Sequence, residues 1–550
     1  MIPSGYKEDV VYSQIPTSGA GDLSFTRASN GTRINSAGLV EVCPWNLITY
    51  SEEFNNGGKT LVYATIGADV TTAPNGTTTA DSLIEDNSNN LHAVYNFGAL
   101  TYVAGIYSLS CYVKKGTRDW VRVQLYDGTN NPSVYANVNT GVLGTIGGGA
   151  TATIESIGNG WYRISISATM LSATGGWAIY SATSDGGTTY TGTNGATALY
   201  LWGLQINIGA TAKPYFPTTD RLNVPRLTYQ NGGGGCPSLL LEKQSTNLVT
   251  YSEQIDNADW TKQSGVSVTA NQTISPDGTQ NADLVVGNGS AGVFQNGKTV
   301  PTSSANTKSV WLKGVSGGEV VRLQDPDQTI GFTVCTLTTS WQRFTLSETQ
   351  SGGSAGLFVR LIPSGGIYIW GAQVEASSYP TSYIPTTSSS ATRVADLSTS
   401  DTIQTAQTFA GDFTIFADFV PFIDSTDANG MMVLGGGASS LGATYKSYLW
   451  FVGSNVMFTG DAETTIIQRG YSMVVNQRVK IALTRVGSTV KMFINGAQVQ
   501  TTATSSTSIT IRSIGWSYNL PTYQTQGKIN QILLSATGAS DADAISLTTI

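Results

Sequence analysis

The feature that most constrains the fold of this chain is an internal repeat with a period of about 200 residues. The phrase NLITYSEEF begins at Asn46, and NLVTYSEQI begins at Asn247. Four further pairs follow in the same order: APNGTTTADSL from Ala73 with SPDGTQNADLV from Ser275, SCYVKKG from Ser110 with KSVWLKG from Lys308, GWYRISI from Gly160 with SWQRFTL from Ser340, and ALYLWGLQI from Ala198 with GIYIWGAQV from Gly366. The offset falls from about 200 to about 168, as deletions in surface loops of the second copy would produce. The chain is therefore expected to contain two copies of one module.

The matched phrases have the pattern of short β-strands. Leu199 and Leu201 alternate with Tyr200 and Trp202, which predicts a strand with one buried face. The turn sequences Pro-Asn-Gly and Pro-Asp-Gly occur at matched places, where Pro fixes φ and Gly supplies a positive φ. Charged residues make up only 12% of the chain and Gly numbers 62, which favours strands and tight turns. The predicted fold class is all-β, with tandem jelly-roll-like sandwiches.

Changes in composition divide the chain into five segments. They are an extended N-terminal attachment segment (1–45), a first jelly-roll-like module (46–223), a Gly-rich linker that docks (224–246), a second module (247–396) and a C-terminal sandwich (397–550). The N-terminal segment has no obvious core and is expected to dock on the first module or on a partner protein. In the C-terminal sandwich, FTIFADFVPF, RVKIALTRVG and GKINQILLSA predict successive strands. Ser540 predicts the cap of a brief final helix, with Asp541 and Asp543 in its first turn.

Charge and hydropathy limit the classes of partner. The chain has 29 basic and 36 acidic residues, a net charge of −7, and no cluster of Lys and Arg, so nucleic acid is not expected as a partner. No apolar run of about 18 or more residues is present, and the beginning MIPSGYKEDVVYSQIP lacks the regions of a signal peptide. We therefore expect a soluble protein with no membrane segment. Cys43, Cys111, Cys236 and Cys335 are far apart in sequence and are expected to be reduced, in keeping with assembly in a reducing cytoplasm.

Three other phrases resemble phrases that recur in tailed-bacteriophage virion proteins, which include tail fibres, head fibres and minor structural proteins. They are LSFTRASNGTRINSAGLVEV from Leu23, PRLTYQNGGGGCPSLLLEKQSTNLVTYSE from Pro225 and YPTSYIPTTSSSATRVAD from Tyr379. In the family pattern the Arg-Ala-Ser opening runs straight into a Pro-Arg-x-x-Tyr phrase, whereas here a whole module separates them. The two modules are similar to the carbohydrate-binding-module-like jelly rolls of those proteins. The end of the chain, with VKMFINGAQV from Val490, resembles a concanavalin A-like or laminin-G-like domain.

This resemblance implies a virion surface protein, assembled in the host cytoplasm, whose partners are other virion proteins. It would be a tail or head fibre or appendage whose lectin-like modules contribute to attachment to host-surface glycans. A capsid-decorating or tail-joining structural protein without receptor binding is the alternative. A cellular lectin or adhesin also fits the fold, but the missing signal peptide counts against it. Similar fibres are commonly homotrimers, so a homotrimer is expected by analogy, although no heptad stalk or collagen-like repeat is present.

Catalysis is not expected, and a glycan-degrading enzyme is the less favoured third function. His92 is the single histidine, which leaves one candidate for a nucleophile pair and excludes zinc held by several histidines. We expect it to be structural. Candidate carboxylates for glycoside hydrolysis are available, such as Glu52, Glu53, Asp81 and Asp86, but nothing marks one pair over another. The correspondence of Asp81 with Asp283 between the repeats predicts a residue that fixes the module.

Glycan contacts are expected from aromatic side chains in polar loops, because sugar rings stack on exposed aromatic faces. The candidate glycan-binding residues are Trp516, Tyr518, Asn519 and Tyr523 in the phrase WSYNLPTYQ, and Trp177 and Tyr180, with Tyr190, in an insertion of the first module. The stretch from Tyr445 to Trp450 is a further candidate. Aromatic residues at matched positions are instead expected to pack in the shared fold; they are Tyr50 and Tyr251, Trp161 and Trp341, and Trp202 and Trp370.

A structural calcium ion is compatible with such sandwiches, which often hold one through oxygen ligands from loops. Asp424, Asp427 and Asn429 in the phrase IDSTDANG form the best local set of ligands. No other cofactor is expected.

Overall fold

The computed structural model describes residues 4–7, 10–13, 23–26, 31–43, 46–102, 105–171, 173–218, 226–229, 237–287, 291–327, 331–349, 351–361, 366–403, 407–423, 431–436, 447–461, 465–502, 507–515 and 525–550. The chain divides into two compact units. One contains Pro44–Val224, and the other contains Asp22–Cys43 and Pro225–Ile550. Every pairing between the described strands is antiparallel, which confirms the all-β prediction.

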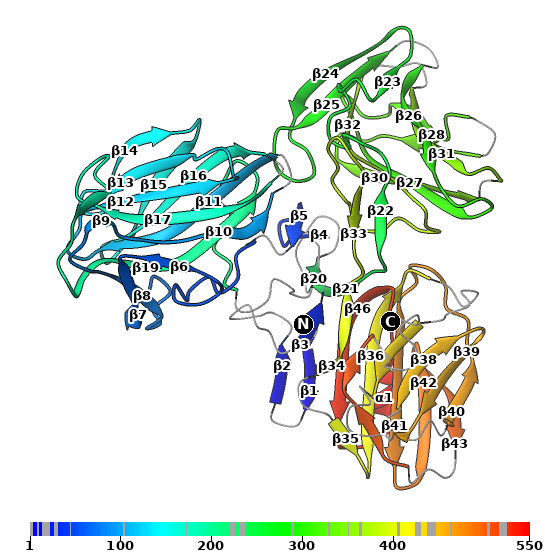
Figure 1. Cartoon of the computed structure of the whole chain (residues 1–550). Coiled ribbons are helices and arrows are strands. Elements are labelled where there is room, and N and C mark those ends of the chain that lie inside the picture. Colours follow the sequence, from blue (N-terminus) through cyan, green and yellow to red (C-terminus); the bar gives the residue numbers. More distant parts are fainter. Residues whose placement is uncertain are drawn as a thin grey trace. The chain divides into compact units, whose positions relative to one another are not determined.

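The first module is a jelly-roll-like sandwich of two six-stranded sheets (Figure 1). One sheet has the order β14 (Val142–Gly147), β13 (Ser133–Asn137), β12 (Trp120–Tyr126), β17 (Thr174–Ala182), β10 (Ala93–Thr101) and β6 (Thr60–Val62). The other has the order β15 (Thr151–Gly158), β16 (Trp161–Met170), β11 (Gly105–Lys115), β19 (Ala196–Ile208), β8 (Ala80–Glu85) and β7 (Ala64–Thr71). The short strands β9 (Asn89–Leu91) and β18 (Thr189–Thr191) pair beside them. The apolar core lies between the two sheets, where alternate residues such as Leu109, Val123 and Ile179 are fully buried.

The second module repeats this architecture with two fewer strands. One sheet has the order β23 (Thr261–Lys262), β26 (Gly292–Thr299), β31 (Ser354–Leu361), β28 (Val320–Gln324) and β29 (Phe332–Thr336). The other has the order β24 (Val266–Thr273), β25 (Ala282–Gly287), β32 (Gly366–Glu375), β27 (Ala305–Gly314) and β30 (Gln342–Thr349). When each order is taken from its last strand to its first, it matches the corresponding sheet of the first module, except that β14 and β15 have no counterpart among the described strands. The absence of counterparts to β14 and β15 from the described strands accounts for the fall of the offset from 199 at Ser110 and Ser309 to 180 at Arg163 and Arg343. The further fall to 168 at Trp202 and Trp370 follows from a shorter connection between the later strands.

Packing around the matched aromatic residues is the same in both modules. The ring centroids of Trp202 and Tyr215 are 4.6 Å apart, and those of Trp370 and Tyr383 are 4.8 Å apart. Trp161 is 2% exposed, and its indole N–H donates to the carbonyl oxygen of Thr72 at 3.1 Å. The matched tryptophans thus serve the shared fold, as predicted.

In one pair of matched phrases, SCYVKKG and KSVWLKG, the residues that correspond in the structure differ by one position from the predicted alignment. Arg163 donates to Ser110 Oγ at 3.0 Å, and Arg343 donates to Ser309 Oγ at 2.9 Å. Ser110 therefore corresponds to Ser309, and not to Lys308 as the alignment of SCYVKKG with KSVWLKG implied. Lys308 instead occupies the place of the core residue before Ser110.

The C-terminal sandwich has a seven-stranded and a five-stranded sheet. The larger has the order β20 (Arg226–Thr228), β21 (Ser238–Leu241), β46 (Gly527–Ser535), β36 (Phe413–Pro421), β41 (Val479–Val486), β42 (Thr489–Ile494) and β43 (Ala497–Thr502), and the smaller has the order β40 (Thr465–Gly470), β39 (Asn455–Thr459), β38 (Tyr448–Val452), β37 (Met431–Gly435) and β45 (Ser513–Ile514). The remaining strand pairs are β1 (Ser4–Lys7) with β2 (Val10–Ser13), β3 (Leu23–Thr26) with β34 (Leu397–Ile403), β4 (Gly31–Ile34) with β5 (Val40–Cys43), β22 (Ser245–Asn247) with β33 (Ala391–Arg393), and β35 (Gln407–Phe409) with β44 (Ile509–Ile511).

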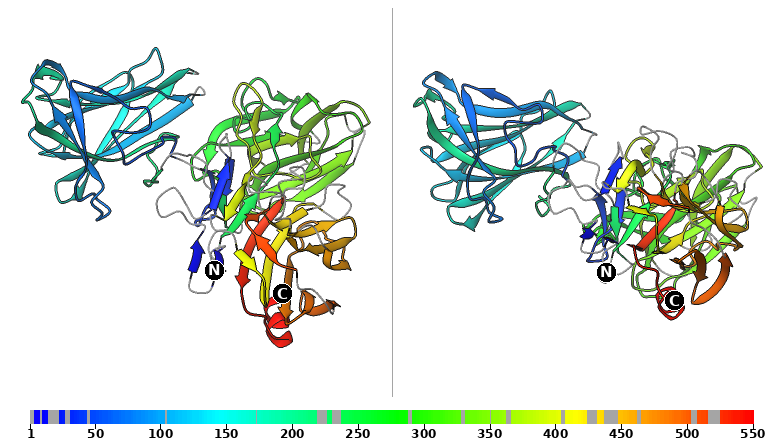
Figure 2. Two further views of the ribbon diagram at one scale, coloured as in Figure 1. Left: turned by 60° about the horizontal axis from the view of Figure 1, so that its bottom comes forward. Right: turned by 90° about the horizontal axis from the view of Figure 1, so that it is seen from below.

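A single helix, α1 (Asp541–Thr548), is present in the described part of the chain, and it packs on the C-terminal sandwich (Figure 2). As predicted, Ser540 caps it, and the Ser540 hydroxyl accepts the N–H of Asp543 at 3.2 Å. Within the described residues, no helix has the length and apolar character needed to cross a membrane.

Two of the predicted segments have different roles from those expected. The predicted linker supplies β20 and β21 to the larger sheet of the C-terminal sandwich, where Leu239 pairs with Ile529. The N-terminal hairpin β4–β5 packs on the second module. Val40 donates its N–H to the Pro276 carbonyl at 2.9 Å and lies in an apolar cluster with Trp370. The reason is apolar burial, because Val40 and its neighbours have no core of their own.

The first module is an insertion between two segments that meet in space. Tyr229 donates its N–H to the Ile34 carbonyl at 2.9 Å, and Ile34 donates its N–H to Thr228 Oγ1 at 3.1 Å. The hairpin β4–β5 and strand β20 are thus neighbours, although a whole module separates them in the sequence. The two segments therefore form one structural element around the inserted module.

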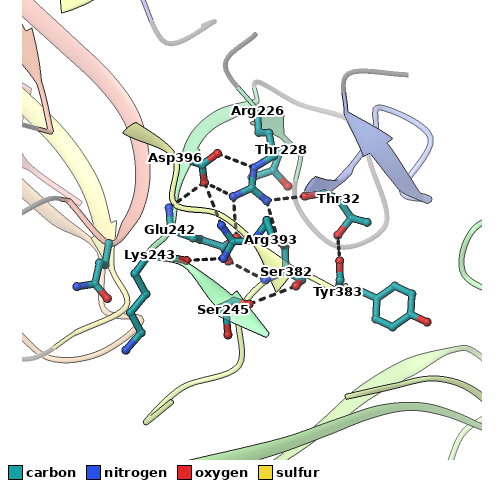
Figure 3. Close-up of polar contacts among 12 residues, drawn as sticks. Thr32, Arg226, Thr228, Glu242, Lys243, Ser245, Ser382, Tyr383, Arg393 and Asp396 are labelled. Atoms are coloured by element: carbon teal, nitrogen blue, oxygen red, sulfur yellow. Dashed lines mark hydrogen bonds and ion pairs between the residues drawn. The ribbon is translucent and has the colours of Figure 1, made fainter. Parts of the chain in front are cut away.

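A group of four buried charged side chains lies where these segments join, and we call it the charge cluster (Figure 3). Arg226 donates to Asp396 Oδ1 at 3.1 Å and to Glu242 Oε2 at 2.8 Å. Arg393 lies 3.5 Å from Glu242 and 3.6 Å from Asp396. No side chain of the four is more than 4% exposed. Burial opposes the ionisation of Glu242, but Arg393 and Arg226 hold its pKa below the usual value.

The charge cluster also binds two neighbouring segments. Arg226 donates to the Thr32 carbonyl at 2.7 Å and to Ser382 Oγ at 2.6 Å. Ser382 donates its N–H to Glu242 Oε1 at 2.7 Å, and Thr32 Oγ1 donates to the Tyr383 carbonyl at 2.5 Å. The hairpin β4–β5, the second module and the C-terminal sandwich are therefore joined by one set of polar contacts.

Replacing Arg226 should strongly destabilise this unit. Arg226→Met would leave Glu242 and Asp396 buried with one cation, and breaking a buried ion pair on one side costs about 3–5 kcal/mol. Chemical denaturation of the full chain should show this loss. The exposed Arg469 provides the control, since Arg469→Met should change stability by less than about 0.5 kcal/mol. Equal effects of the two substitutions would contradict the assigned role.

A matched set of serine, tyrosine and glutamate lies in each module. In the second module, Ser252 Oγ and the Tyr383 hydroxyl oxygen are 2.6 Å apart, and Tyr383 donates to Glu253 Oε1 at 3.1 Å. The corresponding residues of the first module are Ser51, Tyr215 and Glu52. Burial, and then the nearby carboxylate of Asp277, raise the pKa of Glu253 to about 7.

Glu253 should make the stability of the second module depend on pH. Its folded-state pKa is above the unfolded value, so the folded state holds the extra proton between about pH 4.5 and about pH 7. Stability should fall as the pH rises through that window, by at most about 1.4 kcal/mol per pH unit. Glu253→Gln should remove this slope, whereas Glu155→Gln, at an exposed site, should keep it. Amide hydrogen exchange of the 248–255 segment, corrected for intrinsic rates, measures the effect, and an unchanged slope in Glu253→Gln would refute it.

Candidate functional site

Aromatic side chains gather on the outer face of one sheet of the first module, on the side away from the core. Residues of β12 alternate, so Val121 and Val123 enter the core while Arg122 and Gln124 face outward. Neighbouring strands place rings beside them. We call this surface the aromatic face; it consists of Tyr95, Phe97, Arg122, Gln124, Tyr126, Tyr135 and Tyr180.

The rings of the aromatic face form two groups. Tyr95 and Phe97 stack with centroids 4.5 Å apart at 27°, and Phe97 lies 4.6 Å from Tyr126. Arg122 pairs with Tyr135 on one side and Tyr180 on the other, and its guanidinium carbon lies 5.8 Å and 5.2 Å from their ring centroids. On the aromatic face, Gln124 (4% exposed) and Tyr180 (9% exposed) are buried, and the other side chains are partly exposed. Partly exposed ring faces beside a cation are a surface on which a sugar ring can stack.

Short residues of β17 allow the rings to approach one another. Ala178 pairs with Tyr95 and Gln124, and Gly176 pairs with Tyr126. A Cβ atom on Gly176 would lie 1.7 Å from the Asn96 carbonyl oxygen, so only glycine fits there. The sequence TGGWAIY thus fixes the spacing of the aromatic face.

Polar groups lie among the rings. Gln124 Nε2 donates to Asn131 Oδ1 at 2.9 Å, which holds the amide in place. Arg122 Nε is buried and has no hydrogen-bond partner among the described residues. A buried donor without an acceptor is costly, so Arg122 is held on this face by its ring contacts and not by hydrogen bonds at Nε.

The second module carries a related face with a different character. Arg322 and Gln324 stand at the matching register, and Arg322 Nε is likewise buried without a partner in the described structure. However, Phe358 stands where the first module has Ala178, and Phe332, under Arg322 at 4.4 Å, is 52% exposed. This face is more apolar and lacks the tyrosines of the first module.

Trp177 and Tyr180, predicted to lie together in an exposed insertion, face opposite ways. Both belong to β17, and a separation of three residues places them on opposite faces because side chains alternate along a strand. Trp177 is fully buried in the core beside Phe54, so its predicted glycan contact is wrong. Tyr180 is 9% exposed and belongs to the aromatic face.

Tyr190 is also held inside the module. Its hydroxyl donates to Glu85 Oε2 at 2.7 Å and lies 2.7 Å from Ser181 Oγ, and the Arg118 guanidinium covers its ring at 4.5 Å. Its polar group is thus already satisfied, and its ring is not available for stacking.

Most of the other predicted glycan-binding and calcium-binding residues are not among those that the structure describes. Trp516, Tyr518, Asn519 and Tyr523 lie outside the described residues, as do the predicted calcium ligands Asp424, Asp427 and Asn429, and also Cys236 and Tyr445. Among the described residues, no three acidic, His or Cys side chains are grouped so that they could hold a metal ion.

The residues considered for catalysis have structural roles. His92 is fully buried against the Tyr190 ring at 4.6 Å, and its Nε2 lies 3.3 Å from Asp86. Asp81 accepts the N–H groups of Phe54 and Asp69 at 2.7 and 3.0 Å. The matched residue of the second module, Asp283, accepts those of Asp256 and Asn271. As predicted from their correspondence, these two carboxylates fix their modules.

No family model matches the chain, and no curated protein matches it. Among solved structures, the tandem CBM22 domains of Xyn10C from Paenibacillus barcinonensis are 11% identical, over 60% of this chain and 98% of that one, with a TM-score of 0.23. The LG1-3 region of the laminin alpha2 chain is 11% identical over 82% of this chain and 96% of that one, with a TM-score of 0.19. The active domain of tailspike protein 4 of bacteriophage CBA120 is 17% identical over 23% of this chain and 21% of that one, with a TM-score of 0.20. At these values, the assignment of the site depends on the chain's own side chains.

Truncation of the inward-facing Trp177 of β17 should destabilise the first module more than truncation of the outward-facing Tyr95 of β10. Trp177→Ala removes a fully buried ring and should cost the first module about 3–5 kcal/mol. Tyr95→Ala removes a partly exposed ring and should cost about 1 kcal/mol. Thermal denaturation of the full chain would compare them, and a larger loss for Tyr95→Ala would contradict the described orientation.

Proposed function

We propose that this chain is a glycan-binding protein of the bacteriophage virion surface and that the aromatic face of the first module is its glycan site. The observation that carries the proposal is the group of partly exposed rings around Arg122 and Gln124. A core does not need these rings, because they lie on the outer side of the sheet. Sugar rings offer apolar faces for stacking and hydroxyl groups for hydrogen bonds, and this surface offers both.

Binding, and not cleavage, is the proposed activity. The His92 ring is buried, and Asp81 and Asp283 are occupied by backbone N–H groups. None of these groups lies on the aromatic face. The virion assignment is supported by the three phrases that resemble those of tailed-phage structural proteins, all of which contribute residues to the charge cluster and its contacts.

The test is binding of the full chain to an array of bacterial surface polysaccharides. Tyr95→Ala and Arg122→Ala should each weaken binding about tenfold, which corresponds to about 1.4 kcal/mol. Tyr63→Ala is the matched control, because Tyr63 is an exposed aromatic residue of the same module outside the aromatic face. Absence of binding to any polysaccharide would refute the glycan function, and binding unaffected by either variant would refute this site.

A role in joining virion proteins is the second candidate, and the second module favours it. Phe332 and Val334 are 52% and 53% exposed on its outer face, where they could pack against another protein. Electron microscopy of assembled particles tests this candidate. A copy number that follows capsid symmetry would support decoration, and a position at the tip of a fibre would oppose it.

A further inference from the structure

The core of the second module contains a buried lysine with two carboxylates. Lys308 in β27 is fully buried, and its Nζ lies 3.3 Å from Asp325 Oδ2 and within hydrogen-bonding distance of Glu348 Oε1. Nζ also donates to Asn306 Oδ1 at 2.7 Å. The side chains of Asp325 and Glu348 are 0% and 5% exposed. These ionisable groups lie in the interior of the sandwich and take no part in the proposed glycan site.

The first module has apolar residues at the matching places. Because Ser110 corresponds to Ser309, Lys308 takes the place of Leu109, which is fully buried in the first core. Gln124 corresponds to Gln324 by register, so Asp325 takes the place of Leu125, which is also fully buried. The fold itself therefore does not require ions here, and replacement of such a pair by apolar residues is commonly neutral or stabilising. Packing of the core therefore gives no reason for Lys308, Asp325 and Glu348 to be present here.

Lys308 and Asp325 belong to opposite sheets of the module. Lys308 lies in β27 between Leu346 of β30 and Val374 of β32. Asp325 directly follows β28 in the other sheet. A bond between the two side chains would join the sheets across the core.

The carboxyl group of Asp325 is held as an acyl acceptor would be. Gly356 donates its N–H to Oδ2 at 3.0 Å, and Asp327 donates its N–H to Oδ1 at 3.0 Å. Backbone N–H groups in this position stabilise the charge that develops on oxygen when a nucleophile adds to the carbonyl carbon. The nucleophile, Lys308 Nζ, is already 3.3 Å from one carboxyl oxygen, so little reorganisation is needed.

Glu348 stands where a proton carrier is required. Its Oε1 contacts Lys308 Nζ, and its Oε2 is buried without a hydrogen-bond partner in the described structure. It can therefore take a proton from the amine and return it to the leaving oxygen.

We propose that Lys308 and Asp325 form an intramolecular amide bond, with Glu348 as the residue that transfers the proton. The Nζ–Cγ bond forms and one Cγ–O bond of Asp325 breaks. Overall, the ammonium and the carboxylate give an amide and one molecule of water, so that charge and atoms balance and no oxidant or co-reactant is required. Loss of two opposite charges from a dry core favours the amide, since each buried ion carries a desolvation cost.

Mass spectrometry of the full chain and of its tryptic peptides tests the bond. The intact protein should weigh less than its sequence by one molecule of water, and digestion should release a branched peptide that joins the segments containing Lys308 and Asp325. The linked peptide is decisive, because cyclisation at an Asp-Gly sequence also loses water. An intact mass equal to that of the sequence, or unlinked peptides, would overturn the proposal. Loss of ammonia together with a peptide in which Lys308 is joined to an asparagine would also overturn it, because the acceptor would then be an amide and not Asp325.

Variants separate the roles of the three residues. Lys308→Met and Glu348→Gln should both yield the full sequence mass, while Lys313→Met, on the same strand and partly exposed, should keep the bond. The first module serves as an internal control, since Leu109 and Leu125 should give unlinked peptides. Retention of the linked peptide in Glu348→Gln would exclude Glu348 as the proton carrier. The measurement on the unmodified chain decides the central claim even if a variant does not fold.

Discussion

The charge cluster of Arg226, Glu242, Arg393 and Asp396 is the interaction on which the architecture of the larger unit depends. Four ionised side chains lie at a place that water does not reach, and each is stable there only while the others are present. Through Thr32 and Ser382, the same cluster fixes the N-terminal hairpin and the second module. The predicted linker is therefore an integral part of a sheet, and the first module is an insertion between two segments of this unit.

Strand alternation decides what the inserted module can offer to a ligand. In β12 and β17, every second side chain is committed to the core, and the intervening ones are free to build an outer surface. The first module uses these positions for tyrosines around Arg122, while the second fills the central place with Phe358. Two copies of one fold thus present surfaces of different chemistry without any change in their strand order.

The interiors of the two modules have diverged in the same way as their surfaces. The apolar pair Leu109 and Leu125 corresponds to the charged pair Lys308 and Asp325. A core tolerates such a change only if the buried charges have partners, and Glu348 supplies the second carboxylate. The repeat therefore provides its own comparison, in which one copy shows what the fold requires and the other shows what has been added to it.

The amino-acid sequence by itself determined the two repeated modules, the additional sandwich, the strand phrases and the helix cap at Ser540, because period-two hydropathy and turn residues are local signals. The repeated pattern Val-Arg-x-Gln in β12 and β28 also marks the matched arginines Arg122 and Arg322, but not the rings around them, because those come from other strands. Only the tertiary structure decided that Trp177 points inward, that the hairpin β4–β5 packs on the second module, and that Lys308 meets Asp325. These outcomes depend on which face of a strand is buried and on contacts between residues far apart in the sequence, and no local pattern encodes them.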